Sequence, residues 1–334
     1  MARFADRMEK ITIVTPSYNQ AAYLEQTIQS VLSQNYPNLE YIIIDGGSTD
    51  GSVEIIKKYE NRLTYWVSEK DGGQSDAINK GLQHATGEIF NWLNSDDQYL
   101  PNSLNYIGNY FSENPETNVL CGRQWLLEPD GTRISSAGTT ICDTVEETAV
   151  KMHIDQPCTF FRVSCLRDVG FYVERDLHFM MDAELWLRYL LLFGLSGVKK
   201  TETYFTLFRV HAAAKSSRMY DVYYSDRYNI YAALDLRFNK DKINPKSNAF
   251  QIYFQKKYFF EKINKNLFES FLKIYFLEFF CEKISWKSFF KIYFEIFNFA
   301  WQAKRWRVLF FPLLKVKRFF SKFIETAFKF ILMS

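Results

Sequence analysis

Long hydrophobic runs are missing from this sequence, and their absence argues against a protein that spans a membrane. No stretch approaches the roughly 18 consecutive apolar residues of a membrane-spanning helix, and residues 189–198 form about the longest run. Residues 1–10 carry several charges and lack the apolar centre of a secretory signal. The sequence therefore predicts a cytoplasmic protein.

Cysteine and glycine are scarce where two other classes of protein need them. The 5 cysteines contain no Cys-x-x-Cys pair, which indicates free thiols in a reducing compartment. The turn Pro16-Ser17-Tyr18-Asn19 contains no glycine, so the Gly-x-Gly-x-x-Gly cradle of dinucleotide-binding proteins is missing. This absence argues against a dehydrogenase, and also against a sugar nucleotidyltransferase with its glycine-rich loop.

Charge and aromatic residues are distributed unevenly along the chain. The whole chain carries a formal net charge of +3, whereas residues 251–334 hold 16 Lys or Arg against 6 Asp or Glu and 20 of the 32 Phe. Apolar residues recur at helical spacing between residues 260 and 284, with lysines interleaved. Residues 218–334 are therefore predicted to form basic amphipathic helices. These helices either pack on the rest of the protein or lie on an anionic membrane surface, and no nucleic-acid-binding motif accompanies them.

Short apolar stretches alternate with segments of helical periodicity in the first third of the chain. The predicted strands cover residues 11–15, 41–44, 64–67 and 89–93. This alternation is typical of an α/β fold in which helices flank a mostly parallel sheet. After residue 115 the pattern is less regular, and from about residue 218 it is helical.

Asp96 and Asp97 are the most informative pair in the chain, because they follow a predicted strand directly. The carboxyl ends of parallel strands meet at one edge of a sheet, where open α/β sheets bind ligands. Adjacent carboxylates repel each other unless a cation or several hydrogen-bond donors neutralise them. The pair therefore indicates a Mg²⁺ or Mn²⁺ ion that bridges a phosphorylated ligand. A solvated turn before a helix is the alternative.

Four motifs in register carry a family resemblance. They are Thr15-Pro16-Ser17-Tyr18-Asn19, Asp45-Gly46-Gly47-Ser48-Thr49-Asp50-Gly51, Asp76-Ala77-Ile78-Asn79-Lys80-Gly81 and Asn94-Ser95-Asp96-Asp97. With them the sequence resembles, over about residues 10–216, a family 2 glycosyltransferase with the GT-A fold, of the kind that builds bacterial surface polysaccharides. The resemblance implies a catalytic domain over residues 1–217, with a nucleotide-binding half (10–115) and an acceptor half (116–217).

The resemblance also implies how a nucleotide-sugar donor is held. The turn after the first strand would frame the base, Asp45 would lie near the base or ribose, and Asp96 would face the ribose or a metal-bound water. Asp97 would ligate Mg²⁺ or Mn²⁺, with His211 near the metal or the diphosphate. Many relatives have Asp where this chain has Gly46, so one base contact is either lost or made by Asp76. Many also have Arg where this chain has Ile78, so a phosphate-facing Arg is absent there. The implied donor-binding residues are Pro16, Ser17, Tyr18, Asp45, Asp76, Asn79 and Asp96.

The second half is expected to bind the acceptor. Asp182 matches the acidic residue that serves as general base in such enzymes, with Glu184 as the runner-up. Taken alone, Asp182 is also an acid favoured by the dipole of a helix N-terminus. His153, Gln156 and Pro157 resemble a segment that lines the acceptor pocket.

The expected function is therefore that of a metal-dependent inverting glycosyltransferase, with a UDP-sugar as the favoured donor. Its acceptor would be a hydroxyl of a glycan or a lipid-linked glycan at the inner face of the cell membrane. Two alternatives remain open at the level of sequence. One is a sugar nucleotidyltransferase, which would release pyrophosphate rather than a nucleoside diphosphate. The other is a non-catalytic membrane-associated scaffold that retains the fold.

Overall fold

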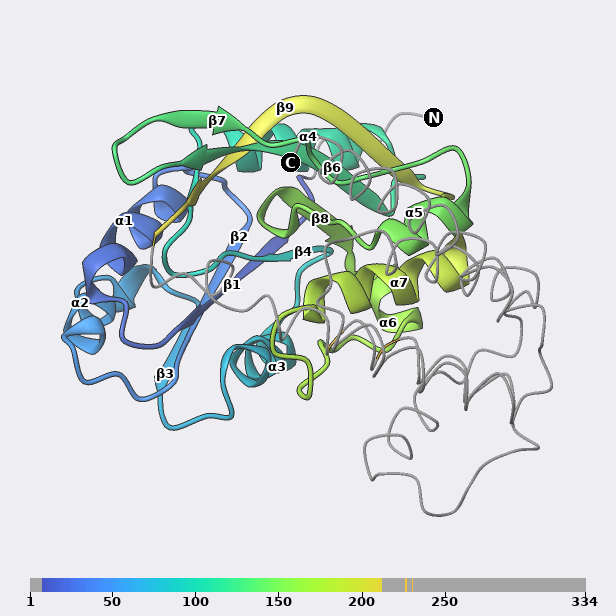
Figure 1. The fold of residues 1–334 in the computed structure, drawn as a ribbon. Helices are drawn as coiled ribbons and strands as arrows, with labels where there is room; N and C mark the ends of the chain where they lie inside the picture. The colour runs from blue at the N-terminus through green and yellow to red at the C-terminus, as the bar shows by residue number, and fades with distance from the viewer. Residues whose placement is uncertain (1–7, 212–225, 227–229, 231–334) are drawn as a thin grey trace, which may run out of the picture. The chain divides into compact units, whose positions relative to one another are not determined.

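The computed structural model describes residues 8–211 together with Asp226 and Ile230 (Figure 1). By its internal contacts the chain divides into two compact units, Met1–Tyr231 and Ala232–Ser334. The second unit lies outside the described residues. The predicted boundary between residues 217 and 218 also lies outside the described residues. So do the amphipathic helices predicted over residues 218–334, apart from Asp226 and Ile230.

The first half of the described chain is a regular alternation of strands and helices. Its four strands pair in parallel in the order β3-β2-β1-β4, as the sequence predicts. The elements are β1 (Ile11–Ser17), α1 (Ala21–Leu32), β2 (Leu39–Asp45), α2 (Ser52–Lys58), η1 (Glu60–Arg62), β3 (Tyr65–Ser68), α3 (Gln74–His84) and β4 (Ile89–Trp92).

The second half extends the same sheet with strands of both directions. From β4 the order continues β8-β6-β9-β5, and β7 pairs with β6. Its elements are β5 (Gln98–Tyr99), α4 (Ser103–Glu113), β6 (Val119–Leu127), β7 (Arg133–Ser135), α5 (Val145–Lys151), η2 (Gln156–Cys158), β8 (Thr159–Arg162), α6 (Val163–Asp168), α7 (Met181–Phe193) and β9 (Val198–Arg209).

The prediction of a mostly parallel sheet is wrong for this second half. The pairs β4–β8, β6–β8, β6–β7 and β5–β9 are antiparallel, while β6–β9 is parallel. Parallel neighbours need a long crossover, usually a helix, whereas a tight turn can join only antiparallel strands. The short turn at residues 128–132 imposes the antiparallel pairing of β6 with β7. The fold is therefore mixed α/β.

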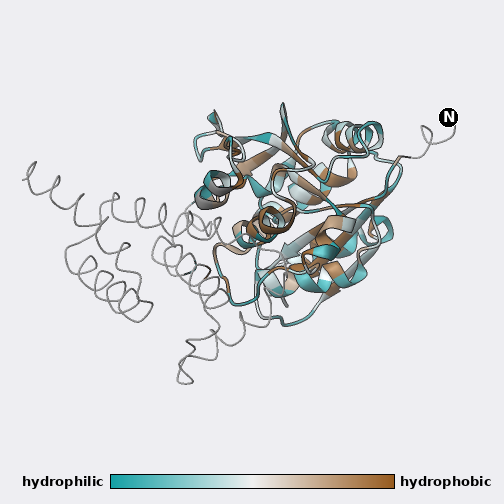
Figure 2. Ribbon diagram, turned by 90° about the vertical axis from the view of Figure 1, so that its right-hand side faces the viewer, coloured by the Kyte–Doolittle hydropathy of each residue, from teal (hydrophilic) through white to brown (hydrophobic). Residues whose placement is uncertain are grey.

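The core lies between the sheet and its helices. Every residue of β1 is buried, as a strand covered on both faces requires. Helix α1 buries Leu24, Ile28 and Val31, which recur at the spacing of one helix face. Figure 2 shows hydrophobic residues running through the centre of the described unit and hydrophilic residues on its outer turns. Among the described residues no helix is long and apolar enough to cross a membrane.

Strand register brings distant segments to one edge of the sheet. Ser17, at the end of β1, lies beside Asp45, which in turn lies beside Ser68 at the end of β3. Strand β9 pairs with β6 along its length and, near its end, also with β5, where Leu207 faces Gln98. The end of β9 therefore lies next to the Asp96-Asp97 turn. His211, just after β9, contacts Asp96, although 115 residues separate the two in the chain.

Candidate active site

A cleft of about 790 Å³ opens at the carboxyl ends of the parallel strands. This volume falls in the range of small-molecule sites, roughly 300–1,000 Å³. The cleft is walled by the ends of β1 and β4, by the turn before α3, by residues 152–157 and by the start of α7. Eight residues singled out from the sequence line it, namely Pro16, Ser17, Tyr18, Asp96, His153, Gln156, Pro157 and Asp182.

The first turn presents one exposed ring and one buried hydroxyl to the cleft. The Tyr18 side chain is 62% exposed, although large aromatic side chains are usually well covered. Ser17 is buried, and among the described residues its Oγ has no hydrogen-bond partner. Buried polar groups are nearly always paired, so the Ser17 hydroxyl is a candidate contact for a ligand that binds in the cleft.

Asp45 lies behind the cleft wall rather than in it. It is fully buried, and its Oδ2 accepts hydrogen bonds from the Gly47 and Ser48 backbone N–H groups (3.1 and 2.9 Å) and from Ser68 Oγ (2.6 Å). Its Oδ1 accepts from Ser48 Oγ at 2.6 Å. The carboxylate is thus committed to holding the glycine-rich loop that follows β2.

Asp71, unlike Asp45, is among the described residues of the cleft. Its Oδ1 accepts a hydrogen bond from the Gly73 backbone N–H at 2.8 Å. Burial raises the pKa of Asp71 above its ordinary value. A Cβ on Gly46 would lie 3.0 Å from Asp71 Oδ2, so glycine at position 46 gives this carboxylate its room. The signal missed in the sequence is that the turn starting at Asp71 follows a predicted strand.

Asp76 and Asn79 are not among the described residues that line the cleft. Asp76 Oδ1 pairs with Arg175 Nη2 at 2.9 Å. Asn79 Nδ2 donates to Val173 O, and the Val173 N–H donates back to Asn79 Oδ1, both at 2.8 Å. Both side chains therefore hold the segment after α6 against α3.

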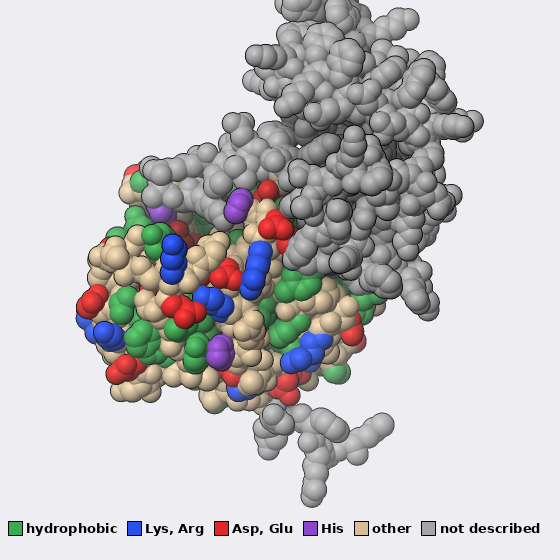
Figure 3. Space-filling model, turned by 90° about the horizontal axis from the view of Figure 1, so that it is seen from below, with side chains coloured by type: hydrophobic (Ala, Val, Ile, Leu, Met, Phe, Trp, Pro, Cys, Tyr) green, Lys and Arg blue, Asp and Glu red, His purple; other side chains and the backbone are tan. Residues whose placement is uncertain are grey.

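Figure 3 shows acidic and basic side chains interspersed on the face seen from below, rather than a patch of one sign.

Asp96 lines the cleft, and His211, which is not among the described residues that line it, contacts Asp96. Their Oδ2 and Nε2 atoms are 3.0 Å apart, with side-chain exposures of 20% and 12%. The His211 ring packs on Tyr23, with centroids 4.9 Å apart. Arg209, which the sequence did not single out, donates from Nε to the Asp96 backbone oxygen at 3.2 Å.

Asp97 points away from the cleft, into the protein. It is 1% exposed, and its Oδ1 accepts a hydrogen bond from the Arg209 backbone N–H at 3.0 Å. Burial, and then the neighbouring Asp96 carboxylate, hold the pKa of Asp97 well above its ordinary value. Asp97 therefore ties the end of β9 to the turn after β4.

A divalent cation fits this end of the cleft only together with a substrate. In the part of the chain that the structure describes, no cluster of three or more His, Cys, Asp or Glu side chains could hold a metal ion. Asp96 and His211 supply one oxygen and one nitrogen donor. Mg²⁺ commonly takes one or two carboxylates from the protein and the rest of its ligands from phosphate groups and water. The Asp96 carboxylate matches that arrangement, whereas an imidazole such as that of His211 is not a usual ligand of Mg²⁺.

Asp182 and Glu184 are separated by the geometry of α7. Asp182 lies half-buried in the first turn of α7 and lines the cleft, with its Oδ1 accepting from the Ala183 backbone N–H at 2.7 Å. Residues two apart on a helix point in opposite directions. Glu184 accordingly faces inward and pairs with Arg188 Nε at 2.9 and 3.0 Å, both side chains being 1% exposed. Asp182 is therefore the member of the pair that can reach a substrate.

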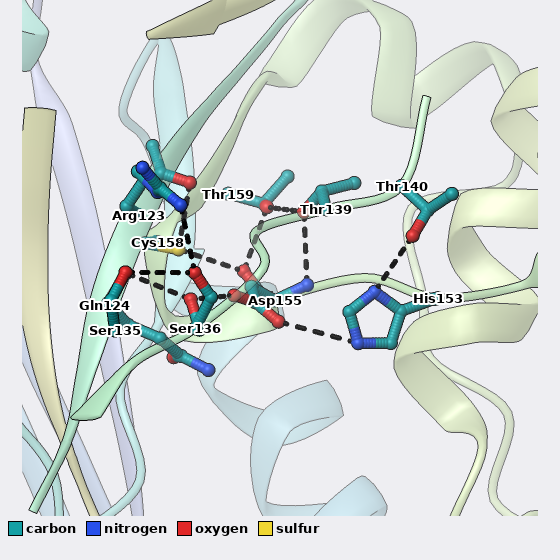
Figure 4. A network of polar contacts seen from close by, with 11 residues as sticks. Arg123, Gln124, Ser135, Ser136, Thr139, Thr140, His153, Asp155, Cys158 and Thr159 are labelled. Atoms are coloured by element: carbon teal, nitrogen blue, oxygen red, sulfur yellow. Dashed lines mark hydrogen bonds and ion pairs between the residues drawn. The ribbon is translucent and has the colours of Figure 1, made fainter. Parts of the chain in front are cut away.

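The cleft residues His153 and Asp155 belong to a polar network that extends beyond the cleft (Figure 4). His153 is half-exposed, with Nδ1 at 3.2 Å from Thr140 Oγ1 and Nε2 at 3.7 Å from Asp155 Oδ1. Asp155, buried, accepts from Ser136 Oγ at 2.6 Å. Gln156 is fixed by two bonds from its Nε2, to Asn91 Oδ1 (2.7 Å) and Trp92 O (2.8 Å). The sequence predicted His153 and Gln156 here and missed Asp155.

Comparison with known proteins places residues 12–170 in the family described as Glycosyl transferase family 2. An uncharacterized glycosyltransferase of Rickettsia typhi is 30% identical over 193 residues, which are 54% of this chain and 58% of the relative. A putative teichuronic acid biosynthesis glycosyltransferase, TuaG of Bacillus subtilis, is 39% identical over 97 residues, 28% of this chain and 38% of the relative. The chain thus spans less than two thirds of the length of these relatives.

Solved structures of S. aureus TarS share the fold. One superposes with a TM-score of 0.61 at 18% identity, covering 90% of this chain and 82% of TarS. A complex of TarS with UDP-GlcNAc superposes with a TM-score of 0.56 at 17% identity, covering 80% of each chain. The family predicted from the four motifs is confirmed for the matched part of the chain: residues 12–170 match the family Glycosyl transferase family 2.

Proposed function

We propose that this protein is a metal-dependent inverting glycosyltransferase that moves a sugar from a UDP-sugar to a hydroxyl of a glycan or lipid-linked acceptor in cell-surface polysaccharide synthesis. One observation carries the proposal: Asp96 and Asp182 line the same cleft, as do Tyr18 and Asp71. A donor site and a candidate base thus open on one space. The names of TuaG, a teichuronic acid enzyme, and of the TarS complex with UDP-GlcNAc support the choice of pathway and donor.

The uridine lies between Tyr18 and Asp71. An exposed phenol ring offers a face for a planar base, and a carboxylate accepts a hydrogen bond from an N–H group. Ser17 Oγ, buried and without a partner among the described residues, gains a partner when the nucleotide binds.

The diphosphate lies at the end of the cleft marked by Asp96, which His211 contacts. Asp96 Oδ2 and His211 Nε2 would hold a Mg²⁺ or Mn²⁺ ion, which neutralises the negative charge that develops on the leaving diphosphate. Arg209 and Asp97 orient this end, because Arg209 bonds to the backbone of Asp96 and to the carboxylate of Asp97. Asp97 is a second candidate ligand, and the experiments below separate the two.

Asp182 takes the proton from the acceptor hydroxyl. The acceptor oxygen forms a bond to the anomeric carbon while the bond from that carbon to the diphosphate oxygen breaks. A single displacement of this kind inverts the configuration at the carbon, and the hydroxyl proton passes to the Asp182 carboxylate. His153 and Gln156, which line the same cleft, hold the acceptor sugar in place.

The protein works at the inner face of the cell membrane, where a lipid-linked acceptor is found. The support for this placement is the excess of basic and aromatic residues in 251–334, since each Lys or Arg near an anionic surface contributes on the order of 1 kcal/mol. That segment lies outside the described residues.

A donor screen tests the proposed function. Purified full-length protein is incubated with UDP-, GDP- and dTDP-sugars in Mn²⁺, in Mg²⁺ and in EDTA, and the nucleotide products are separated. We expect release of UDP that EDTA abolishes. Release of pyrophosphate would instead indicate a nucleotidyltransferase, and the absence of turnover and of nucleotide binding would indicate a scaffold.

A further inference from the structure

Asp226 reaches the start of helix α7 from beyond the region that matches the family. Of the residues after His211, the structure describes Asp226 and Ile230, which are 4% and 0% exposed. Asp226 Oδ2 accepts hydrogen bonds from the Phe179 backbone N–H at 2.7 Å and from the Met180 backbone N–H at 3.2 Å. Both atoms lie immediately before the helix that carries Asp182.

The start of α7 needs such a partner. The first N–H groups of a helix have no acceptor within the helix and are commonly satisfied by the side chain at the N-cap. The N-cap here is Met180, which makes no capping side-chain bond. A carboxylate is also favoured at this end by the helix dipole. Asp226 accepts from one of these groups, the Met180 N–H, and from the Phe179 N–H just before it, and it adds a negative charge at this end from 46 residues further along the chain.

The backbone that Asp226 holds is part of the cleft. Phe179, Met180 and Met181 line the cleft together with Asp182. Helix α3 holds the same segment from another direction, because Ser75 Oγ donates to Met181 Sδ at 2.8 Å and Asn79 pairs with Val173. Without the Asp226 contacts, this segment would be held on the α3 side alone, and the start of α7 could shift relative to Asp96. A displacement of about 1 Å in a catalytic group can cost roughly 100-fold in rate.

We propose that Asp226 is a positioning residue for Asp182, so that a residue beyond His211 completes the acceptor side of the active site. This inference rests on the proposed function in one respect, namely that Asp182 is the base. It assigns Asp226 no contact with the substrate: Asp226 acts by fixing the backbone from which Asp182 projects.

The test uses the full-length chain and three variants, Asp226→Ala, Asp226→Asn and Glu113→Ala. The asparagine keeps an oxygen that can accept both N–H groups, whereas alanine removes it. Glu113 is an exposed carboxylate at the end of α4 and is not among the described residues that line the cleft, which makes it a matched control. We expect amide hydrogen exchange at residues 179–184 to be about five- to tenfold faster in Asp226→Ala, the typical effect of losing a cap. Asp226→Asn should restore most of the protection, and Glu113→Ala should match the wild type.

Turnover is measured on the same proteins as UDP released from UDP-GlcNAc in Mn²⁺, alongside the affinity for UDP. Asp226→Ala should lower kcat by roughly tenfold or more with the Kd for UDP nearly unchanged, and Asp226→Asn should recover most of the rate. Wild-type exchange at residues 179–184, or wild-type kcat, in Asp226→Ala would overturn the inference. Full turnover in Asp182→Asn would overturn the assignment of the base instead, so the two failures can be told apart.

Discussion

Asp96 Oδ2 and His211 Nε2 lie 3.0 Å apart, although 115 residues separate them in the chain. Strand β9 makes this contact, because it pairs with β5 directly after the Asp96-Asp97 turn. The contact joins a carboxylate that lines the cleft, where a diphosphate is proposed to bind, to an imidazole that lies just after β9.

The first prediction separates Asp96 from Asp97 as metal ligands. Asp96→Asn should weaken Mn²⁺-dependent binding of UDP by more than about tenfold, since even the partners of metal ligands contribute that much. Asp97→Asn keeps an oxygen that can accept the Arg209 N–H, so the fold should survive. Titration calorimetry with and without Mn²⁺ measures both variants. If Asp97→Asn alone abolishes the metal dependence, the ligand is Asp97, as the family resemblance implies.

The second prediction concerns the base. Asp182→Asn should lower kcat by about 10²- to 10⁴-fold while the Kd for the donor stays nearly constant, because Asp182 is on the acceptor side. Glu184→Gln should act on stability, since breaking a buried pair such as Glu184–Arg188 costs about 3–5 kcal/mol. Steady-state kinetics and thermal unfolding distinguish the two effects. The roles are exchanged if Glu184→Gln loses turnover with an unchanged Tm and Asp182→Asn does not.

The third prediction tests the close approach of Gly46 and Asp71. In Gly46→Ala the new Cβ would lie 3.0 Å from Asp71 Oδ2, so the carboxylate must give way by a few tenths of an ångström. We expect the Kd for UDP to rise about tenfold, the effect of losing one hydrogen bond to a charged group. Gly72→Ala is the matched control, because its Cβ would meet its nearest neighbour at an ordinary 3.5 Å. Equal affinities of the two variants would contradict a role for Asp71 in nucleotide binding.

The fourth prediction is a pH dependence of stability that comes from Glu40. Burial acts to raise the pKa of Glu40, but hydrogen bonds from Lys10, Thr12 and Thr86 outweigh burial and lower the pKa from 4.5 to about 2. A pKa that is lower in the folded state stabilises the fold above the unfolded value, and this contribution is lost as pH falls from 4.5 towards 2.

Glu40→Gln should therefore be less stable than the wild type at pH 7, by on the order of 1–2 kcal/mol after allowance for solvent screening. The difference should narrow below about pH 4. Urea unfolding at a series of pH values measures it. A gap between the two proteins that is the same at pH 7 and pH 3 would rule out this origin.

The fifth prediction concerns residues 251–334. A chain ending at residue 250 should no longer sediment with anionic liposomes, whereas the full chain should. It should still bind UDP, because the described cleft residues all precede that point. High salt should weaken the attachment of the full chain only in part, since the apolar contribution is not screened. Equal sedimentation of both chains would leave packing on the protein as the role of the segment.

The sequence alone determined the family, the parallel half of the sheet and the location of the cleft. Motifs that follow β1, β2 and β4 could be recognised because side chains at the carboxyl ends of parallel strands must gather at one edge. The regular alternation of strands and helices up to β4 made those ends visible. Beyond β4 the strands change direction without a regular period, so the antiparallel pairs of β8, β7 and β5 could not be predicted.

Only the tertiary structure decided which carboxylate of each candidate set faces the cleft. Asp71 lines the cleft, whereas Asp45 is enclosed by hydrogen bonds from the loop. Asp182 lines the cleft, whereas Glu184 pairs with Arg188. Asp96 lines the cleft, whereas Asp97 is buried. Neighbouring residues have the same chemistry in the sequence, but the backbone turns their side chains in different directions. Burial and long-range partners then fix these orientations: Arg209 holds Asp97, and Asp226 holds the backbone just before α7. Burial and long-range contacts depend on the folded chain and cannot be read from the sequence.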